Sequence, residues 1–268
     1  MTNIRETGTY LDRILAETVK TVEASKQKVS PLEMAARART APSPVRLQVP
    51  VDTLGVIAEF KRASPSKGRF EAELDPADVA DAYIEGGVVG ISCLTDEPFF
   101  QGSLDDLDTV VSTSRGRVPV LRKDFTIDIY QIDEARAHGA SIILLIVAAL
   151  DDRQLIEFIE HTKLLGMDAL VEVHDEEEAH RAMSAGASLI GINNRDLRSF
   201  HTDLATTERI APLLHPDTVT VGESGIYTTA DAERMAAAGC DLILVGESLI
   251  LQADRAPAVR ELSSVRRR

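Results

Sequence analysis

Eight short apolar runs with helical patterns between them limit the possible folds of this chain more than any other feature of its sequence. The runs are rich in Val, Ile and Leu and lack polar alternation, which is typical of strands buried on both faces of a parallel sheet. They are Val56–Phe60, Val88–Leu94, Val118–Leu121, Ile142–Val147, Ala169–Val173, Leu189–Ile192, Val219–Val221 and Leu242–Val245.

The stretches between the runs indicate repeated βα units, because they have helical periodicity and several end at a glycine. Helices are expected at Pro76–Glu85, Asp128–His138, Asp152–Leu165, Asp175–Ala185 and Thr228–Ala238. Eight such units fit a closed (β/α)8 barrel better than a doubly wound sheet, which has roughly five or six strands and a glycine-rich first turn. We therefore predict an α/β fold, a TIM barrel, with residues 1–268 as one domain.

The first 45 residues precede this pattern. Tyr10–Ser25 has the apolar spacing of an amphipathic helix. A second helix is expected over Pro31–Arg39, with Ser30 as its N-cap. Because an amphipathic segment needs a surface to cover, we expect residues 1–45 to form a helical extension that packs over the ligand-binding end of the barrel and helps to bind substrate.

Composition excludes several classes of protein. A net charge of −14 argues against a nucleic-acid surface. Cys93 and Cys240 lack the spacing of a zinc site or of a disulfide framework, and both lie in apolar runs, so buried, reduced thiols are expected. The longest apolar run, Ile142–Leu150, is too short to cross a bilayer, and the polar start of the sequence does not resemble a signal peptide. We expect a cytoplasmic protein without a membrane anchor or a metal site.

Charged residues gather at the carboxyl ends of the runs, where barrels bind their ligands. Alternation along the first run places Glu59 and Lys61 inside the barrel and the large apolar Phe60 on the side of the helices. Buried charges are costly unless they are paired, so two lysines and three glutamates at one end indicate acid–base chemistry rather than stability alone. The five are Glu59, Lys61, Lys123, Glu172 and Glu223.

Taken singly, some of these residues allow a structural explanation. Arg195 and Asp196, after the sixth run, are more typical of an ion pair that ends a strand, and Glu59 alone fits either reading.

Two glycines indicate a bound phosphate. Gly225 opens the loop after the seventh run and Gly246 ends the eighth, and these loops are the usual phosphate site of the fold. Either glycine alone is compatible with a tight turn. With Ser64 and Ser224 nearby, the pair favours phosphate binding.

The motifs at these strand ends resemble those of indole-3-glycerol-phosphate synthases, and the resemblance runs from the N-terminal helices to the eighth strand. The matching segments are VIAEFKRASPSKG at 56–68, SCLTDEPFFQGS at 92–103, VLRKDF at 120–125, LVEVH at 170–174, IGINNRDL at 190–197 and GESGI at 222–226. The first and third of these motifs are highly specific.

The resemblance implies an activity in tryptophan biosynthesis. The family closes the indole ring of 1-(2-carboxyphenylamino)-1-deoxyribulose 5-phosphate with loss of CO2 and water, and it uses no metal or organic cofactor. Lys123 then corresponds to the general acid that protonates the substrate carbonyl oxygen. Lys61 corresponds to the lysine that holds the carboxylate, and the resemblance leaves open how the acid role in ring closure and dehydration is divided between the two lysines. Glu172 corresponds to the general base.

The other implied residues orient or bind the substrate. Glu59 orients the cations, Asn193 hydrogen-bonds a sugar hydroxyl, and Glu223 lies near the anilino nitrogen. Glu247 departs from the small residue often found at its position, so only its backbone N–H is expected to face the phosphate. The substrate-binding set is Ser64, Ser224, Gly225, Gly246 and Glu247 around the phosphate, Phe100, Phe125, Leu144 and Leu197 around the aromatic ring, and Arg195 and Glu223. Ordinary packing is the alternative for the four apolar residues.

Two other functions are less consistent with these motifs. Phosphoribosylanthranilate isomerase lacks the helical extension and the EFKRASPS motif. A non-catalytic phosphate-binding barrel does not need Lys61, Lys123, Glu59 and Glu172 together. The expected ligand is a small phosphorylated molecule, and we expect a monomer with no obligatory protein partner.

Overall fold

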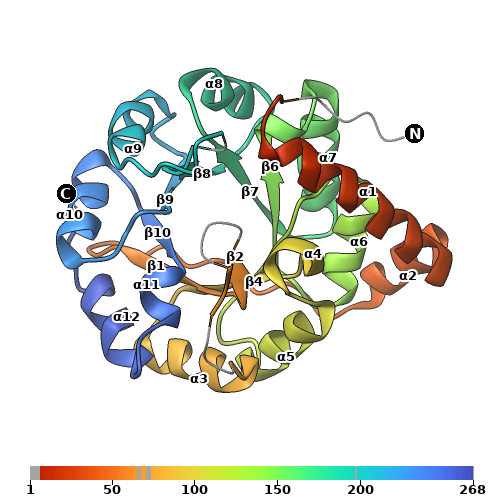
Figure 1. Ribbon diagram of the computed structural model, residues 1–268, viewed down its shortest axis with the longest axis horizontal. Coiled ribbons are helices and arrows are strands. Elements are labelled where there is room, and N and C mark those ends of the chain that lie inside the picture. Colours follow the sequence, from red (N-terminus) through yellow and green to blue (C-terminus); the bar gives the residue numbers. More distant parts are fainter. Residues whose placement is uncertain (1–6, 65–67, 71–73, 197, 268) are drawn as a thin grey trace.

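The computed structural model describes residues 7–64, 68–70, 74–196 and 198–267, and within these ranges eight parallel strands close into a barrel (Figure 1). Around the barrel the order is β1-β10-β9-β8-β7-β6-β5-β4. Barrel strands that are consecutive in the sequence are therefore neighbours in the sheet. Each predicted run overlaps one strand, which confirms the TIM barrel. The strands are β1 (Gly55–Phe60), β4 (Gly90–Leu94), β5 (Val120–Lys123), β6 (Ile142–Ile146), β7 (Asp168–Val173), β8 (Leu189–Asn193), β9 (Val219–Glu223) and β10 (Leu242–Val245).

Helices surround the barrel and cover the outer face of the sheet (Figure 1). Most begin at an Asp, Ser or Thr whose side chain accepts hydrogen bonds from backbone N–H groups of the first turn, which fixes where each helix starts. The helices around the barrel are α3 (Pro76–Gly86), α5 (Leu104–Ser114), α6 (Ile129–Ala137), α7 (Asp152–Leu164), α8 (Glu176–Ser184), α9 (Ala205–Ile210), α10 (Thr229–Ala238) and α12 (Arg255–Ser263), with the short α4 (Glu97–Phe100) and α11 (Glu247–Ile250) at its rim.

The strands are apolar throughout because both of their faces are covered. In β6, Leu144 and Ile146 line a pocket at the carboxyl end of the barrel. Ile143 and Leu145, which alternate with them, are completely buried and point the other way, toward the helices. Cys93 and Cys240 are buried and unpaired, as predicted. No helix in the described part of the chain is both long and apolar enough to span a bilayer.

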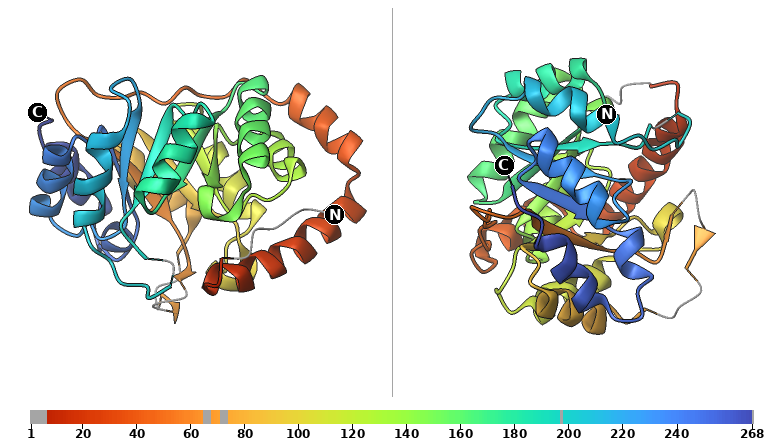
Figure 2. Two further views of the ribbon diagram at one scale, coloured as in Figure 1. Left: turned by 90° about the horizontal axis from the view of Figure 1, so that it is seen from above. Right: turned by 90° about the vertical axis from the view of Figure 1, so that its left-hand side faces the viewer.

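The two N-terminal helices pack at different places. Helix α1 (Tyr10–Lys28) lies at the carboxyl end of the barrel on the side of α6, with Leu11 and Leu15 buried (Figure 2). Helix α2 (Pro31–Thr40) lies instead beside α6, so it does not cover the barrel end as the sequence had led us to expect. The reason is that the chain turns between the helices, and the Tyr130 hydroxyl donates hydrogen bonds to the carbonyls of Ser25 and Val29 at that turn, each at 3.2 Å.

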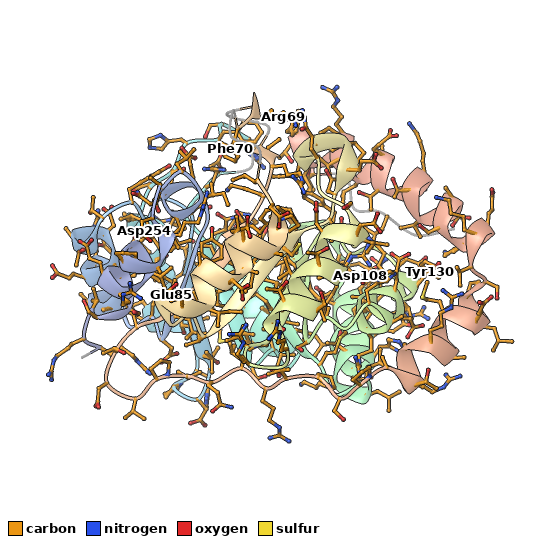
Figure 3. All side chains as sticks on the ribbon, turned by 90° about the horizontal axis from the view of Figure 1, so that it is seen from below. Arg69, Phe70, Glu85, Asp108, Tyr130 and Asp254 are labelled. Carbon is orange, nitrogen blue, oxygen red and sulfur yellow. The ribbon has the colours of Figure 1, made fainter. Side chains whose placement is uncertain are left out.

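A small hairpin follows β1 and was not predicted. Its strands are β2 (Ala63–Ser64) and β3 (Gly68–Arg69), which pair antiparallel. Figures 2 and 3 show this hairpin, with Arg69 and Phe70, at the same end of the barrel as α1.

Candidate active site

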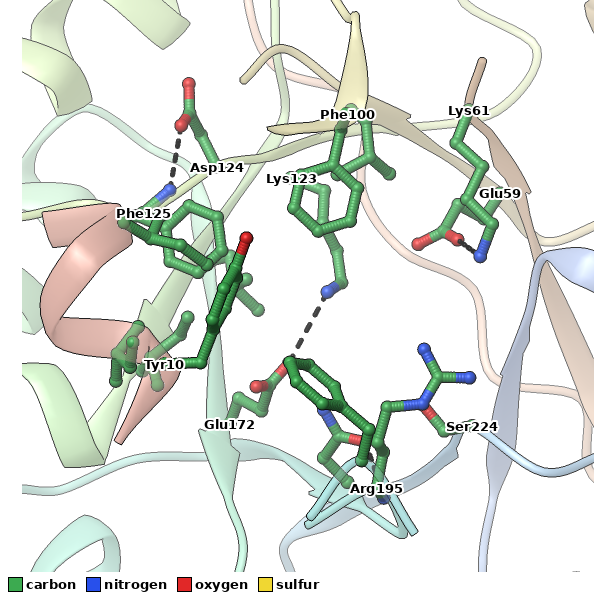
Figure 4. A pocket seen from close by; sticks show the side chains of 17 residues that line it. Tyr10, Glu59, Lys61, Phe100, Lys123, Asp124, Phe125, Glu172, Arg195 and Ser224 are labelled. Carbon is green, nitrogen blue, oxygen red and sulfur yellow. Dashed lines mark hydrogen bonds and ion pairs between the residues drawn. The ribbon is translucent and has the colours of Figure 1, made fainter. Parts of the chain in front are cut away.

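Two adjoining pockets occupy the carboxyl end of the barrel, and they share five residues: Glu59, Lys61, Lys123, Arg195 and Ser224. The first pocket lies toward α1 and combines apolar and charged side chains (Figure 4). The second lies between the loops after β9 and β10. We call them the ring pocket and the loop pocket.

The structure brings together most of the residues predicted from the sequence. Lining the ring pocket are Glu59, Lys61, Phe100, Lys123, Phe125, Leu144, Glu172, Asn193, Arg195 and Ser224. Lining the loop pocket are also Glu223, Gly225, Gly246 and Glu247. Ser64 is buried in β2 and lines neither pocket, and Leu197 lies outside the described residues.

Lys61 and Glu59 form a buried ion pair at the end of β1. The alternation of the strand directs both side chains into the barrel, and Nζ of Lys61 lies 2.7 Å from Oε1 of Glu59. Burial by itself raises the pKa of Glu59, but the charges of Lys61 and Lys123 outweigh this effect, and the pKa lies below its ordinary value. Glu59 is therefore ionised at neutral pH.

Lys123, the last residue of β5, reaches between two carboxyl groups from other strands. Its Nζ lies 3.4 Å from Oε2 of Glu172 and 4.0 Å from Oε2 of Glu223. Burial by itself lowers the pKa of Lys123, but the carboxylates of Glu172, Glu223 and Glu59 outweigh it and raise the pKa above its ordinary value. The ammonium group therefore carries a proton that it can donate.

Glu172 and Glu223 have opposite charge states although both are buried. Burial raises the pKa of Glu172, but Lys123 and His174 more than offset this and hold it well below its ordinary value. Burial, together with the nearby charge of Glu172, raises the pKa of Glu223 to about 8. At neutral pH Glu172 is a carboxylate and Glu223 holds its proton. Carboxyl groups with separated pKa values are typical of acid–base sites.

Gly191 in β8 leaves the space that Glu223 occupies. A Cβ at this position would overlap Oε1 of Glu223, and it would also lie 3.2 Å from Cδ1 of Leu170. A larger residue here would displace the carboxyl group from Lys123. The sequence motif around Gly191 was recognised, but this reason for the glycine becomes visible only in three dimensions.

Aromatic side chains form the wall of the ring pocket. Phe100 and Phe125 have ring centroids 6.1 Å apart. Tyr10, from α1, packs edge to face against Phe200 at 5.4 Å, and both line the pocket. The sequence did not indicate Tyr10 or Phe200 as site residues, because Tyr10 precedes the barrel and Phe200 lies far along the loop between β8 and α9. The amphipathic pattern of the extension was the only signal for Tyr10.

Asn193 and Arg195 are held by local hydrogen bonds after β8. The backbone N–H of Arg195 donates to Oδ1 of Asn193 at 3.0 Å. A hydrogen bond between the side chains of Asn193 and Glu172 further favours the charged form of Glu172. Arg195 contributes an attractive charge toward Glu59 and lines both pockets, so it does more than end the strand.

The backbone turns sharply where the loop pocket begins. Ser224 has a left-handed backbone with φ of 62°, which is uncommon for a residue other than glycine and is often found at functional sites. The Ser248 hydroxyl donates to the carbonyl of Ile226 at 2.9 Å, which ties together the loops after β9 and β10. This hydrogen bond joins the two sides of the loop pocket.

Comparison with known proteins gives consistent matches. A family model described as "Indole-3-glycerol phosphate synthase" matches residues 11–262. Indole-3-glycerol phosphate synthases from Mycolicibacterium smegmatis and Mycobacteroides abscessus are each 49% identical over 257 residues, covering 95% of this chain and 94% of the relative. The enzyme of that name from Mycobacterium tuberculosis is 47% identical with the same coverage.

Solved structures agree on the fold. A thiamine phosphate pyrophosphorylase from Pyrococcus furiosus superposes with a TM-score of 0.60 at 18% identity, covering 79% of this chain and 94% of that one. A 3-hexulose-6-phosphate synthase from Salmonella typhimurium gives 0.61 at 16% identity, covering 79% and 97%. At such low identity these matches show the barrel alone.

Proposed function

The chain belongs to the indole-3-glycerol phosphate synthase family of decarboxylating lyases, and we propose that its two pockets together hold 1-(2-carboxyphenylamino)-1-deoxyribulose 5-phosphate while the indole ring closes. One observation carries the proposal for the site. Lys123 stands where an apolar aromatic pocket meets a pocket between two loops, with a charged and a neutral carboxyl group beside it.

The shape of the site supports one orientation of the substrate. The ring pocket, with Phe100, Phe125 and Leu144 in its walls, suits the anthranilate ring. The loop pocket suits the phosphate, because Gly225, Gly246 and Glu247 line it and glycines let an anion approach the backbone. The carbonyl carbon of the open-chain sugar then lies between the pockets, beside Lys123.

Lys123 acts as the general acid of ring closure. The ring carbon that bears the carboxylate attacks the carbonyl carbon, and the carbonyl oxygen takes a proton from Nζ of Lys123. Lys61, oriented by Glu59 at 2.7 Å, holds the substrate carboxylate until CO2 leaves. Loss of the hydroxyl group as water then needs a second proton, which either lysine can supply.

Glu172 acts as the general base that removes the last proton and restores aromaticity. Its carboxylate is ionised and faces the same space as Lys123. Glu223, protonated at neutral pH, lies near the anilino nitrogen, and Asn193 hydrogen-bonds a sugar hydroxyl. Ser224 assists phosphate binding, and Arg195 binds across the two pockets.

The proposal extends to the cellular compartment and the oligomeric state of the protein. The two buried, unpaired cysteines support action in the reducing cytoplasm. We also propose that the protein acts as a monomer, with no obligatory partner and no organic cofactor or metal. Light scattering on the purified protein tests the oligomeric state.

Isotope labelling tests the proposed chemistry. Substrate with ¹³C in its carboxyl group is expected to release labelled CO2 and to give an unlabelled indole product with the wild-type protein. Glu172→Gln is expected to bind the substrate without turnover. A product that keeps the label would contradict the proposed ring closure, and an active Glu172→Gln would contradict the assignment of the base.

A further inference from the structure

His174 lies behind the proposed base, on the side away from the acid. It follows β7 two residues after Glu172, so alternation directs both side chains to the same face. Nε2 of His174 lies 3.3 Å from Oε1 of Glu172, whereas Lys123 approaches Oε2 of the same carboxylate at 3.4 Å. The two oxygens of Glu172 therefore have different cationic partners.

Glu178 holds His174 from the other side. Oε2 of Glu178 lies 3.0 Å from Nδ1 of His174 and accepts a hydrogen bond from the backbone N–H of His174 at 2.8 Å. Glu178 is itself fixed, because its backbone N–H donates to the helix N-cap Asp175 at 2.8 Å. The imidazole is thus clamped between two carboxylates, one on β7 and one on α8.

His174 lines neither the ring pocket nor the loop pocket, so it does not contact the proposed substrate. It lies instead beside a separate surface pocket on the α8 side of the barrel. The charged groups that share this pocket are Asp175, Glu177, Glu178, Arg181, Asp196 and Arg198. Any effect of His174 on the reaction must therefore act through Glu172.

The charges around His174 favour the imidazolium. Burial by itself lowers its pKa, but Glu172 and Glu178 outweigh this and raise the pKa to about 10. On the far side of Glu172, Lys123 from β5 adds a second positive charge and Glu223 from β9 a neutral carboxyl group. At neutral pH the base is thus held between two cations.

We propose that His174, held by Glu178, is a positioning residue for the catalytic base: its imidazolium binds one oxygen of Glu172 and leaves the other, which faces Lys123, to accept the proton. The inference rests on the proposed role of Glu172. Without the imidazolium, the buried carboxylate of Glu172 would keep one cationic partner, Lys123, and its hydrogen bond with Asn193.

The first test is the dependence of kcat on pH in His174→Gln, which keeps a polar side chain without the charge. Removing a nearby positive charge raises the pKa of Glu172, so the acid limb of the profile is expected to move up by about 1–3 pH units with little change in KM. His138→Gln is the matched control, because His138 pairs with Asp108 on the surface. An acid limb that stays in place, or equal loss of activity at every pH, would overturn the inference.

The second test reads His174 directly and does not depend on activity. In protein with ¹⁵N-labelled histidine, the His174 ring is expected to stay protonated at about pH 8, and Glu172→Gln is expected to lower its pKa by about 1–3 pH units. Glu178→Gln is expected to lower it as well. A neutral ring at pH 7 in the wild type, or a pKa unmoved in Glu172→Gln, would overturn the inference.

The experiments distinguish the proposed role of Glu172 as base from the proposed role of His174 as its positioning residue. If Glu172→Gln is inactive but the His174→Gln profile is unmoved, only the role of His174 is wrong. If Glu172→Gln keeps wild-type activity, the assignment of the base is wrong and the positioning role falls with it.

Discussion

The carboxylate of Glu59 occupies the space that a side chain at Gly246 would need. A Cβ at Gly246 would overlap Oε1 of Glu59 and lie 2.9 Å from Nζ of Lys61. We had attributed this glycine to the approach of phosphate to the backbone. The structure adds a second reason, because the end of β10 packs directly against the ion pair of β1.

Gly246→Ala is therefore expected to impair catalysis as well as phosphate binding. The methyl group displaces the Lys61–Glu59 pair, and a shift of about 1 Å in a catalytic group costs about 10²-fold in rate. Steady-state kinetics should show a fall in kcat together with a rise in KM. Gly90→Ala is the control. Gly90 is the first residue of β4, at the end of the strand away from the site, and the nearest atom to an added Cβ would be 3.4 Å away. A rise in KM alone would mean that Gly246 serves only the phosphate.

The folded state is expected to lose stability as pH rises, because Glu223 is protonated in the folded protein at neutral pH. Its pKa of about 8 in the folded protein lies above the ordinary value of 4.5. Between these values the folded state holds a proton that the unfolded state has released, so the free energy of unfolding falls with rising pH and levels off above about pH 8. Thermal melting from about pH 5 to about pH 8 should show a smaller fall in Tm for Glu223→Gln than for wild type. Parallel curves would contradict a raised pKa.

Tyr10 tests whether the N-terminal helix contributes to binding. Its ring packs against Phe200 at 5.4 Å in the wall of the ring pocket, and contacts of this kind contribute about 0.5–1.5 kcal/mol. Tyr10→Ala is expected to raise KM about 2- to 10-fold with a smaller effect on kcat. Lys20→Ala, at an exposed position of the same helix, is the control. Equal KM values for the two variants would show that α1 serves stability alone.

The barrel could be predicted from the sequence because its signal is local and repeated. Each strand is buried on both faces, so each appears as an apolar run, and the alternation with helices gives the closed sheet. The β2–β3 hairpin gave no such signal, because each strand has only two residues and no periodicity develops. The position of α2 also could not be predicted, since amphipathicity shows that a helix has a buried face but not which surface it covers.

The site could be predicted where residues follow strands, and not where contacts cross between elements. Lys61, Lys123 and Glu172 end strands, and their convergence follows from the barrel itself. Phe200 belongs to a loop and reaches the ring pocket only through the fold. His174 stood within the recognised LVEVH motif, but its clamp requires Glu178 from the following helix. Gly191 and Gly246 matter because of side chains on other strands.

Indole fluorescence on mixing the protein with the carboxyphenylamino-deoxyribulose phosphate measures the central claim most directly, that Lys123 is the acid of ring closure. The chain has no Trp, so its own background in that channel is low. We predict a rapid rise in signal with the wild type and a kcat about 10²–10⁴-fold lower for Lys123→Ala, with KM little changed. A loss confined to KM would mean that Lys123 only binds the substrate, and no signal from the wild type would contradict the proposed reaction itself.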